Sequence, residues 1–152
     1  MVVPQVNTIV IADDFAEFRG LVRSKLQGDG FHIVAEAADG LEAVAKAAML
    51  QPDLVLLDIQ MPKLNGLEAA TQIRSIAPQS KILFVSQSSD PDIVQSAMSD
   101  GAAGYLCKSK ISRELVPAIE AAIAGKRTVG VQQGPTLNFA SAGMNGTKNR
   151  SR

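Results

Sequence analysis

Short apolar runs and amphipathic stretches alternate along most of the chain. The apolar runs predict five strands, near residues 7–12, 31–37, 53–58, 81–86 and 103–107. Apolar positions spaced three and four apart predict five helices, near residues 15–27, 40–50, 65–76, 91–99 and 112–124. Each predicted strand is followed by a helix, which is the crossover connection that parallel strands need. The pattern therefore predicts an α/β fold with a doubly wound, five-stranded parallel sheet and helices on both faces.

Two of the predicted helices carry further detail. In the first, the apolar stripe over residues 15–26 begins at Phe15 and is expected to pack on the sheet. In the last, Pro117 lacks a backbone donor and lies five residues after Ser112, which could cap the helix. The sequence therefore does not determine at which residue the last helix begins.

Length and composition describe an ordinary globular protein. The chain has 152 residues, 46% of them hydrophobic and 20% charged, which suits one domain with a sizeable core. Cys107 is the only cysteine, so an intramolecular disulfide and a multi-thiolate metal site are excluded. No run approaches the ~18 apolar residues that span a bilayer, and the N-terminus lacks the pattern of a signal peptide. We therefore expect a cytoplasmic protein without a membrane segment.

Charge and composition divide the chain near residue 126. Residues 1–126 contain all 15 acids and 11 Lys and Arg, a net charge of −4, whereas residues 127–152 contain four basic residues and no acid. The second segment is rich in Gly, Ser, Asn, Thr and Gln and shows no periodicity. It is expected to be a flexible basic tail without a DNA-binding domain, and four dispersed charges make a weak nucleic-acid signal.

The predicted strands end in residues that suit phosphate chemistry. Asp13 and Asp14 follow the first strand, Asp58 the third, Ser86 ends the fourth, and Lys108 follows the fifth. The carboxyl ends of parallel strands share one edge, and clustered carboxylates there favour a bound cation, with Mg²⁺ the natural choice for oxygen ligands. Ammonium and hydroxyl groups suit phosphoryl oxygens, and a carboxylate can accept a phosphoryl group. The pattern predicts a phosphate-handling metal site, and Asp58, alone at its strand tip, is better placed to be an acceptor than the adjacent pair Asp13-Asp14.

The spacing of these residues resembles the receiver domain of two-component response regulators over about residues 6–126. The matching elements are Asp13-Asp14, the run Leu56-Leu-Asp58-Ile-Gln-Met-Pro62-x-x-x-Gly66, Ser86, and Tyr105-x-x-Lys108. Residues 101–108 and 115–125 look most like receivers that precede a LuxR-type helix-turn-helix domain. The resemblance implies a flavodoxin-like sheet of order 2-1-3-4-5. It also implies either a stand-alone receiver or a fragment of a longer transcriptional regulator.

The resemblance assigns the reacting groups. Asp58 would accept a phosphoryl group from a histidine kinase, a phosphotransfer protein or a small phosphodonor. Asp13, Asp14 and Asp58, with the backbone carbonyl of Gln60, would bind Mg²⁺, and Lys108 would bind a phosphoryl oxygen afterwards. The protein would then catalyse only its own phosphorylation and dephosphorylation, and would not be an enzyme acting on a separate substrate.

The resemblance also assigns switching and tuning positions. Ser86 would bind a second phosphoryl oxygen, and Tyr105 would turn inward as Ser86 moves. This couples the site to the face made by the fourth helix, fifth strand and fifth helix, which could support a homodimer. Gln60, Gln87 and Ser88 would tune access to the acceptor and the lifetime of the phosphoryl group.

Three other functions remain open from sequence. A magnesium-dependent phosphatase of the haloacid-dehalogenase kind also uses an aspartate nucleophile, but it wants a second aspartate where Gln60 stands. A flavodoxin-like flavin carrier would need donors where the loop after the first strand is acidic. A receiver-like module could also bind partners without phosphorylation. His32 and Cys107 are expected to be packing or surface residues with no role in the site.

Overall fold

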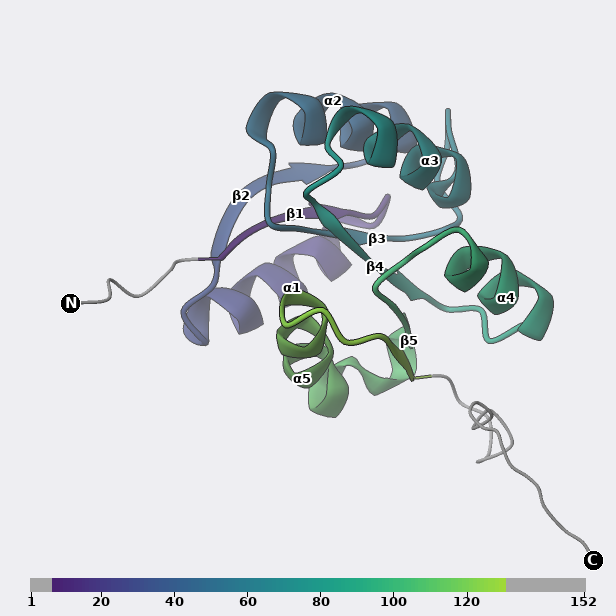
Figure 1. Ribbon diagram of the computed structural model, residues 1–152. Helices are drawn as coiled ribbons and strands as arrows, with labels where there is room; N and C mark the ends of the chain where they lie inside the picture. Colours follow the sequence, from purple (N-terminus) through teal and green to yellow (C-terminus); the bar gives the residue numbers. More distant parts are fainter. Residues whose placement is uncertain (1–6, 131–152) are drawn as a thin grey trace, which may run out of the picture.

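The predicted apolar runs form a parallel sheet, and a helix follows each of the first five strands (Figure 1). The computed structural model describes residues 7–130. The strands are β1 Thr8–Ala12, β2 His32–Ala37, β3 Leu54–Leu57, β4 Lys81–Ser86, β5 Gly104–Cys107 and β6 Thr128–Gly130. The helices are α1 Ala16–Gly28, α2 Gly40–Leu50, α3 Gly66–Ile76, α4 Pro91–Ser99 and α5 Ile111–Ile123, with a short 3₁₀ helix, η1 Lys108–Lys110, before α5.

The strand order is β2-β1-β3-β4-β5-β6, and all neighbours are parallel. The predicted α/β fold and the order of the first five strands are therefore confirmed. The predicted strand count of five is wrong, because a sixth strand pairs with the outer edge of β5.

Helices cover both faces of the sheet, as a doubly wound fold requires. Figure 1 shows α2 and α3 on one side of the strands and α1 and α5 on the other. The core divides in the same way, since α2, α3 and α4 pack with one set of strand side chains and α1 and α5 with the other. β3 is buried along its whole length, so its side chains fill both halves of the core.

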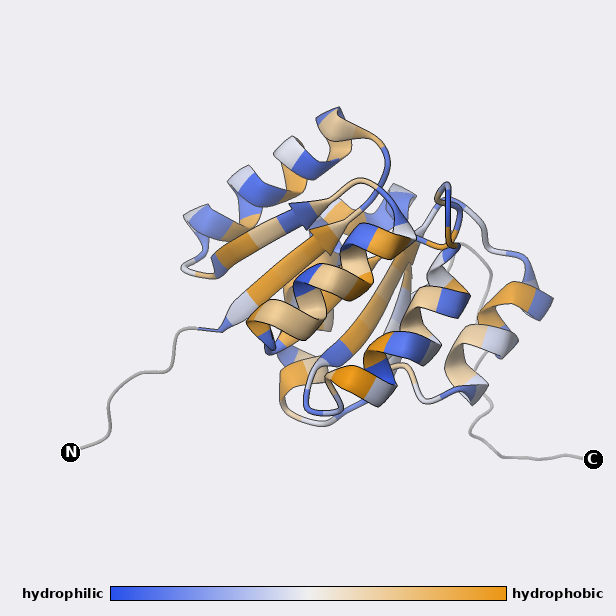
Figure 2. Cartoon of the chain, turned by 90° about the horizontal axis from the view of Figure 1, so that it is seen from above, coloured by the Kyte–Doolittle hydropathy of each residue, from blue (hydrophilic) through white to orange (hydrophobic). Residues whose placement is uncertain are grey.

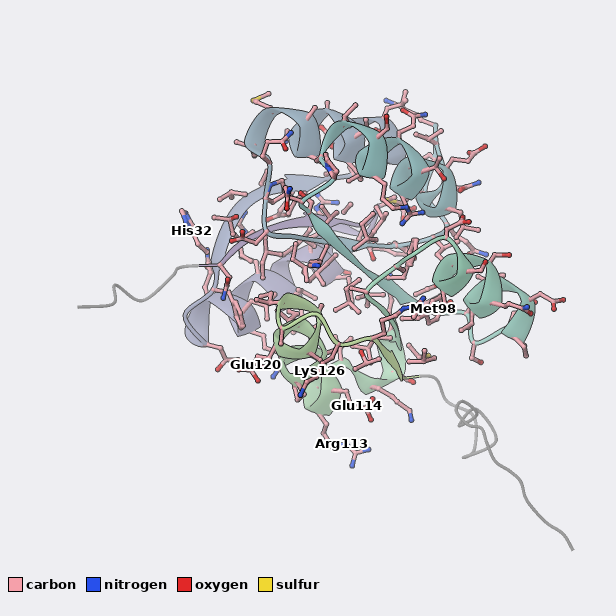
Figure 3. The ribbon with its side chains drawn as sticks, viewed as in Figure 1. His32, Met98, Arg113, Glu114, Glu120 and Lys126 are labelled. Carbon is pink, nitrogen blue, oxygen red and sulfur yellow. The ribbon has the colours of Figure 1, made fainter. Side chains whose placement is uncertain are left out.

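Figure 2 shows strands that are mostly hydrophobic and helices in which hydrophobic and hydrophilic residues are mixed, and the buried residues of each helix pack against the strands. In α5, Leu115 and Ile119 are fully buried, whereas Arg113 and Glu120 are exposed on the outer face (Figure 3). Pro117 lies inside α5, and the helix begins at Ile111 with Lys110 as its N-cap. The cap considered at Ser112 is therefore wrong, because η1 carries the chain directly from β5 into the helix.

β6 extends the folded part beyond the boundary expected at residue 126. Gly104, Tyr105 and Leu106 of β5 pair in register with Thr128, Val129 and Gly130. Arg127 holds the segment that leads into β6. Its Nε donates to the carbonyl of Ala102 at 3.1 Å, and its Nη2 donates to the carbonyl of Met98 in α4. The remainder of the expected tail, residues 131–152, lies outside the described residues.

Within residues 7–130, no helix combines the length and apolar character needed to cross a bilayer.

Candidate functional site

Three carboxylates from two neighbouring strands meet at the carboxyl edge of the sheet. Asp13 and Asp14 follow β1, and Asp58 follows β3, which pairs with β1 in the centre of the sheet. One carboxylate oxygen from each residue lies within 4.8 Å of the others. Asp13 and Asp58 are buried at 2% and 6% exposure, whereas Asp14 is open to solvent. The structure thus brings together the acidic residues that the sequence predicted as a cluster.

Lys108 provides the opposing charge from the end of β5. Its Nζ lies 2.6 Å from Asp13 Oδ2 and 3.4 Å from Asp58 Oδ2, and its side chain is 10% exposed. Strands β5 and β3 are not neighbours, so the long side chain crosses the end of β4 to reach the acidic pair. One ammonium between two nearly buried carboxylates offsets only part of their mutual repulsion.

Burial raises the pKa of Asp58 to about 6, from an ordinary value of 3.8. Lys108 opposes this rise and the neighbouring Asp13 adds to it, while the backbone N–H of Ile59 donates to Asp58 Oδ1 at 2.7 Å. The carboxylate form of Asp58 is therefore held in the folded protein at a cost in free energy. A cation or a covalent change that removes this charge relieves the cost.

Asp58 lines a hollow at the surface with a volume of about 290 Å³. Its lining comes from four of the loops that leave the sheet at this edge: Asp14, Phe15, Asp58, Gln60, Ser86, Gln87 and Lys108. Ser86 is buried at the end of β4, whereas Gln60 and Gln87 are exposed at the rim. The predicted acceptor, hydroxyl, ammonium and two of the tuning residues thus share one cavity. Its polar and charged lining suits an anionic group with a metal ion.

The predicted switch residues are Ser86, which lines this hollow, and Tyr105, which does not; both are hydrogen-bonded to the backbone of Ser88. Ser86 Oγ accepts a hydrogen bond from the backbone N–H of Ser88 at 3.2 Å, and the hydroxyl of Tyr105 donates to the backbone carbonyl of Ser88 at 2.7 Å. Tyr105 is already fully buried in this structure, so the inward position expected of it does not wait for Ser86 to move, and burial raises the pKa of its hydroxyl. The hydroxyl therefore stays protonated as a donor near neutral pH. A continuous path of contacts joins Ser86 to β5.

The loop after Asp58 is fixed by a close backbone approach at Gly66. The N–H of Gly66 donates to the carbonyl of Ile59 at 2.7 Å, and a Cβ at this position would overlap the backbone carbonyl of Asp58. Asn65 caps α3 by accepting the N–H of Glu68 at 2.9 Å. The Asn65-Gly66 pair therefore holds the acceptor loop against the start of α3.

Two kinds of contact around the acidic cluster were not predicted from the sequence. Phe15 was expected in the core but is 59% exposed, because it precedes α1 and lies beyond the end of the sheet. Lys108 Nζ instead sits 4.2 Å from the ring centroid of Phe18 and 5.6 Å from that of Phe15. Arg19, on α1, donates from Nη1 to the backbone carbonyl of Asp13 at 2.7 Å. The spacing of apolar residues predicts neither the contact of Lys108 with the two rings nor the hydrogen bond of Arg19.

His32 and Cys107 lie outside the cluster, as expected. His32 begins β2, so it stands at the amino edge of the sheet, opposite the acidic residues, and is exposed (Figure 3). Cys107 is a buried free thiol at the end of β5. Its Sγ accepts a hydrogen bond from the Ser109 hydroxyl at 3.4 Å and donates to the backbone carbonyl of Gln87 at 3.9 Å.

The donor set at the acidic edge fits a magnesium ion. All three residues offer hard carboxylate oxygens, and the exposed side of Asp14 leaves room for water and phosphate ligands. Asp13 Oδ2 is buried and accepts no hydrogen bond, although the Lys108 ammonium lies beside it. Asp13, Asp14 and Asp58 are therefore the residues that would bind the ion.

Comparison with known proteins identifies the family. Residues 9–120 match the family model of the response regulator receiver domain. The chain belongs to this family and is a receiver domain of two-component signalling.

Relatives in this family include whole receivers and longer regulators. The chain is 39% identical to the transcriptional regulatory protein PdtaR of Mycobacterium tuberculosis over 87% of its own length and 64% of the relative. It is 35% identical to the chemotaxis protein CheY of Listeria monocytogenes over 75% of its length and 96% of that protein. A two-component response regulator of the LuxR family from Aurantimonas has the same fold, with a TM-score of 0.78 and 33% identity over 88% of this chain and 93% of the solved one. The resemblance to LuxR-type receivers is thereby confirmed.

Proposed function

We propose that Asp58 is the phosphoacceptor of this receiver domain and that Asp13, Asp14 and Asp58 bind the Mg²⁺ ion that the reaction uses. The observation that supports this most directly is the position of the Asp58 carboxylate, which lines the hollow and lies 3.4 Å from Lys108 Nζ. The phosphoryl donors are a histidine kinase, a phosphotransfer protein or a small phosphodonor such as acetyl phosphate. The backbone carbonyl of Gln60 completes the proposed ligand set.

The reaction moves a phosphoryl group from the donor to a carboxylate oxygen of Asp58. That oxygen forms the new bond to phosphorus while the bond from phosphorus to the donor breaks, and the donor leaves with the bonding electron pair. Bound Mg²⁺ supplies charge stabilisation for the phosphoryl oxygens. Lys108 is free to leave Asp58 Oδ2 and bind one phosphoryl oxygen, and the Ser86 hydroxyl binds a second. In dephosphorylation, water forms a bond to phosphorus while the bond from phosphorus to the Asp58 oxygen breaks. Asp58 returns to the carboxylate form and phosphate leaves.

The contacts of Ser86 suggest how the new charge reaches the surface. Movement of Ser86 toward the phosphoryl group breaks its hydrogen bond with the N–H of Ser88, whose carbonyl binds Tyr105. The loop before α4 then shifts relative to β5, which changes the face made by α4, β5 and α5. A homodimer through this face has to accommodate β6, which occupies the outer edge of β5.

We propose that the chain acts as a signalling module in the cytoplasm and that Gln60, Gln87 and Ser88 tune its reaction. Gln60 and Gln87 line the hollow and reach solvent at its rim, where they can limit access of donors and water to Asp58. Turnover of its own phosphoryl group is the only reaction proposed, so no separate substrate is expected.

A phosphorylation assay tests the assignment. The protein is incubated with acetyl phosphate, with and without Mg²⁺, and the mass of the intact protein is measured for wild type, Asp58→Asn and the control Asp29→Asn, an exposed carboxylate after α1. We expect one Mg²⁺-dependent phosphoryl adduct in wild type and in Asp29→Asn and none in Asp58→Asn.

Other outcomes point to the alternative functions. Multiple-turnover hydrolysis of phosphate esters would favour the phosphatase, and a yellow purified protein would favour the flavin carrier. A wild-type protein that forms no adduct with acetyl phosphate or with beryllofluoride, a phosphoryl mimic, would favour a binding module that works without phosphorylation.

A further inference from the structure

Arg19 connects the acidic cluster to the edge of the sheet. It lies in the first turn of α1, and its Nη1 donates to the backbone carbonyl of Asp13 at 2.7 Å. Its Nε donates to Glu36 Oε1, on β2, at 2.8 Å, and the side chain is 17% exposed. We propose that Arg19 is a positioning residue for the metal site, which it serves by fixing the backbone between Asp13 and Asp14. This inference rests on the proposed Mg²⁺-dependent function.

The contacts of Asp13 show what Arg19 adds. The N–H of Asp13 donates to the carbonyl of Ala37 at 3.0 Å, and Asp13 Oδ1 accepts the N–H of Phe15 at 2.9 Å. With its carbonyl bound to Arg19, Asp13 keeps only Oδ2 without a hydrogen bond, and this atom faces the other carboxylates and Lys108. Since the Asp13 carbonyl belongs to the planar peptide that leads into Asp14, Arg19 orients both ligands.

Glu36 holds Arg19 in place. Its two carboxylate oxygens accept separate hydrogen bonds, Oε1 from Arg19 and Oε2 from Arg23 Nε at 2.5 Å. Burial alone would raise the pKa of Glu36, but the hydrogen bonds from Arg23 and Arg19 hold it below its ordinary value. Glu36 therefore stays charged near neutral pH and restrains the Arg19 guanidinium by a charge-assisted hydrogen bond.

Arg23 provides a matched control within the same cluster. Both arginines are on α1 and bind the same carboxylate, but of the two only Arg19 is hydrogen-bonded to Asp13 in the described structure. Loss of either guanidinium removes one positive charge from the neighbourhood of the site. Charge alone predicts tighter cation binding after either change, because a nearby repulsion is removed. Loss of positioning predicts weaker binding after loss of Arg19 alone, so the two explanations differ in sign.

Calorimetric titration with Mg²⁺ tests the inference on wild type, Arg19→Gln, Arg23→Gln and Arg19→Lys. Partners behind the direct metal ligands typically change affinity by about 10- to 100-fold. We expect Arg19→Gln to weaken Mg²⁺ binding by about 10-fold, at the lower end of that range. Arg23→Gln should bind Mg²⁺ as tightly as wild type or slightly more tightly, and Arg19→Lys, with one ammonium in place of a two-pronged donor, should fall between wild type and Arg19→Gln. Circular dichroism at the titration temperature confirms that each variant is folded.

A second measurement separates positioning from damage to the acceptor. At low Mg²⁺, Arg19→Gln should form less of the adduct with beryllofluoride, and a saturating concentration of Mg²⁺ should restore it. Wild-type or tighter Mg²⁺ binding by Arg19→Gln would overturn the inference, as would equal weakening by both glutamine variants. If wild type itself binds no Mg²⁺, the proposed function fails, whereas a wild type that binds normally beside an unaffected Arg19→Gln overturns only the role of Arg19.

Discussion

Replacement of Asp58 by Asn should stabilise the protein in the absence of Mg²⁺. The change keeps the size of the side chain and an acceptor for the N–H of Ile59, but removes the buried charge. The gap between the folded pKa of about 6 and the ordinary value of 3.8 corresponds to about 3 kcal/mol of unfolding free energy. Because Asp58 faces a hollow that is open to solvent, screening reduces this figure, and we expect about 1–2 kcal/mol.

The sign of the effect fixes its dependence on pH. The pKa of Asp58 is higher in the folded protein than in the unfolded chain. Its charge therefore costs no stability below about pH 4, and the cost develops as the pH rises through about 6. The advantage of Asp58→Asn should therefore be present at pH 7.5 and fade toward pH 4. Urea unfolding followed by far-ultraviolet circular dichroism, in a buffer with EDTA, measures it directly. Asp29→Asn removes an exposed carboxylate and should show no such trend.

Addition of Mg²⁺ provides the second half of the test. A ligand that binds only the folded state stabilises it by mass action, so Mg²⁺ should stabilise wild type more than Asp58→Asn and narrow the difference between them. An Asp58→Asn protein that is less stable than wild type at pH 7.5 in EDTA would contradict the reasoning. A difference that does not change between pH 4 and 7 would do the same.

Three further changes test other parts of the structure. Tyr105→Phe removes the hydrogen bond to the Ser88 carbonyl and should lower the free energy of unfolding by about 1 kcal/mol, as measured by urea titration. Gly66→Ala places a Cβ against the Asp58 carbonyl and should cost about 3 kcal/mol or more, so an unchanged melting temperature would contradict the close approach. Arg127→Gln removes the bonds to the carbonyls of Ala102 and Met98, and hydrogen exchange should become faster in residues 128–130 while the centre of β3 is unaffected.

The central strands and the acidic edge were predictable because the sequence encodes them locally. In β3, four consecutive apolar residues end in Asp58 and a turn follows at once, which specifies a buried strand with a polar tip. The same reasoning placed Asp13, Ser86 and Lys108 at the ends of their strands. Topology then brings these ends to one edge, so the composition of the site followed from the order of the elements.

The parts that were not predictable depend on contacts between distant residues. β6 has only three residues, too few for a periodic pattern to be recognised, and its strand conformation comes from pairing with β5. Arg19 and Glu36 are 17 residues apart, and the hydrophobic pattern of neither segment predicts the hydrogen bond between them. Phe15 continues an apolar stripe by spacing, but the sheet ends before it.

The family match ends at residue 120, whereas α5 continues to Ile123 and β6 to Gly130. A polypeptide cut at residue 120 would lose the last turn of α5 and leave the apolar β5, Gly104–Cys107, as a bare edge with free backbone donors and acceptors. Unprotected strands of this kind recruit other chains and promote aggregation. Recombinant versions of this receiver should therefore extend at least through residue 130 to remain well behaved at high concentration.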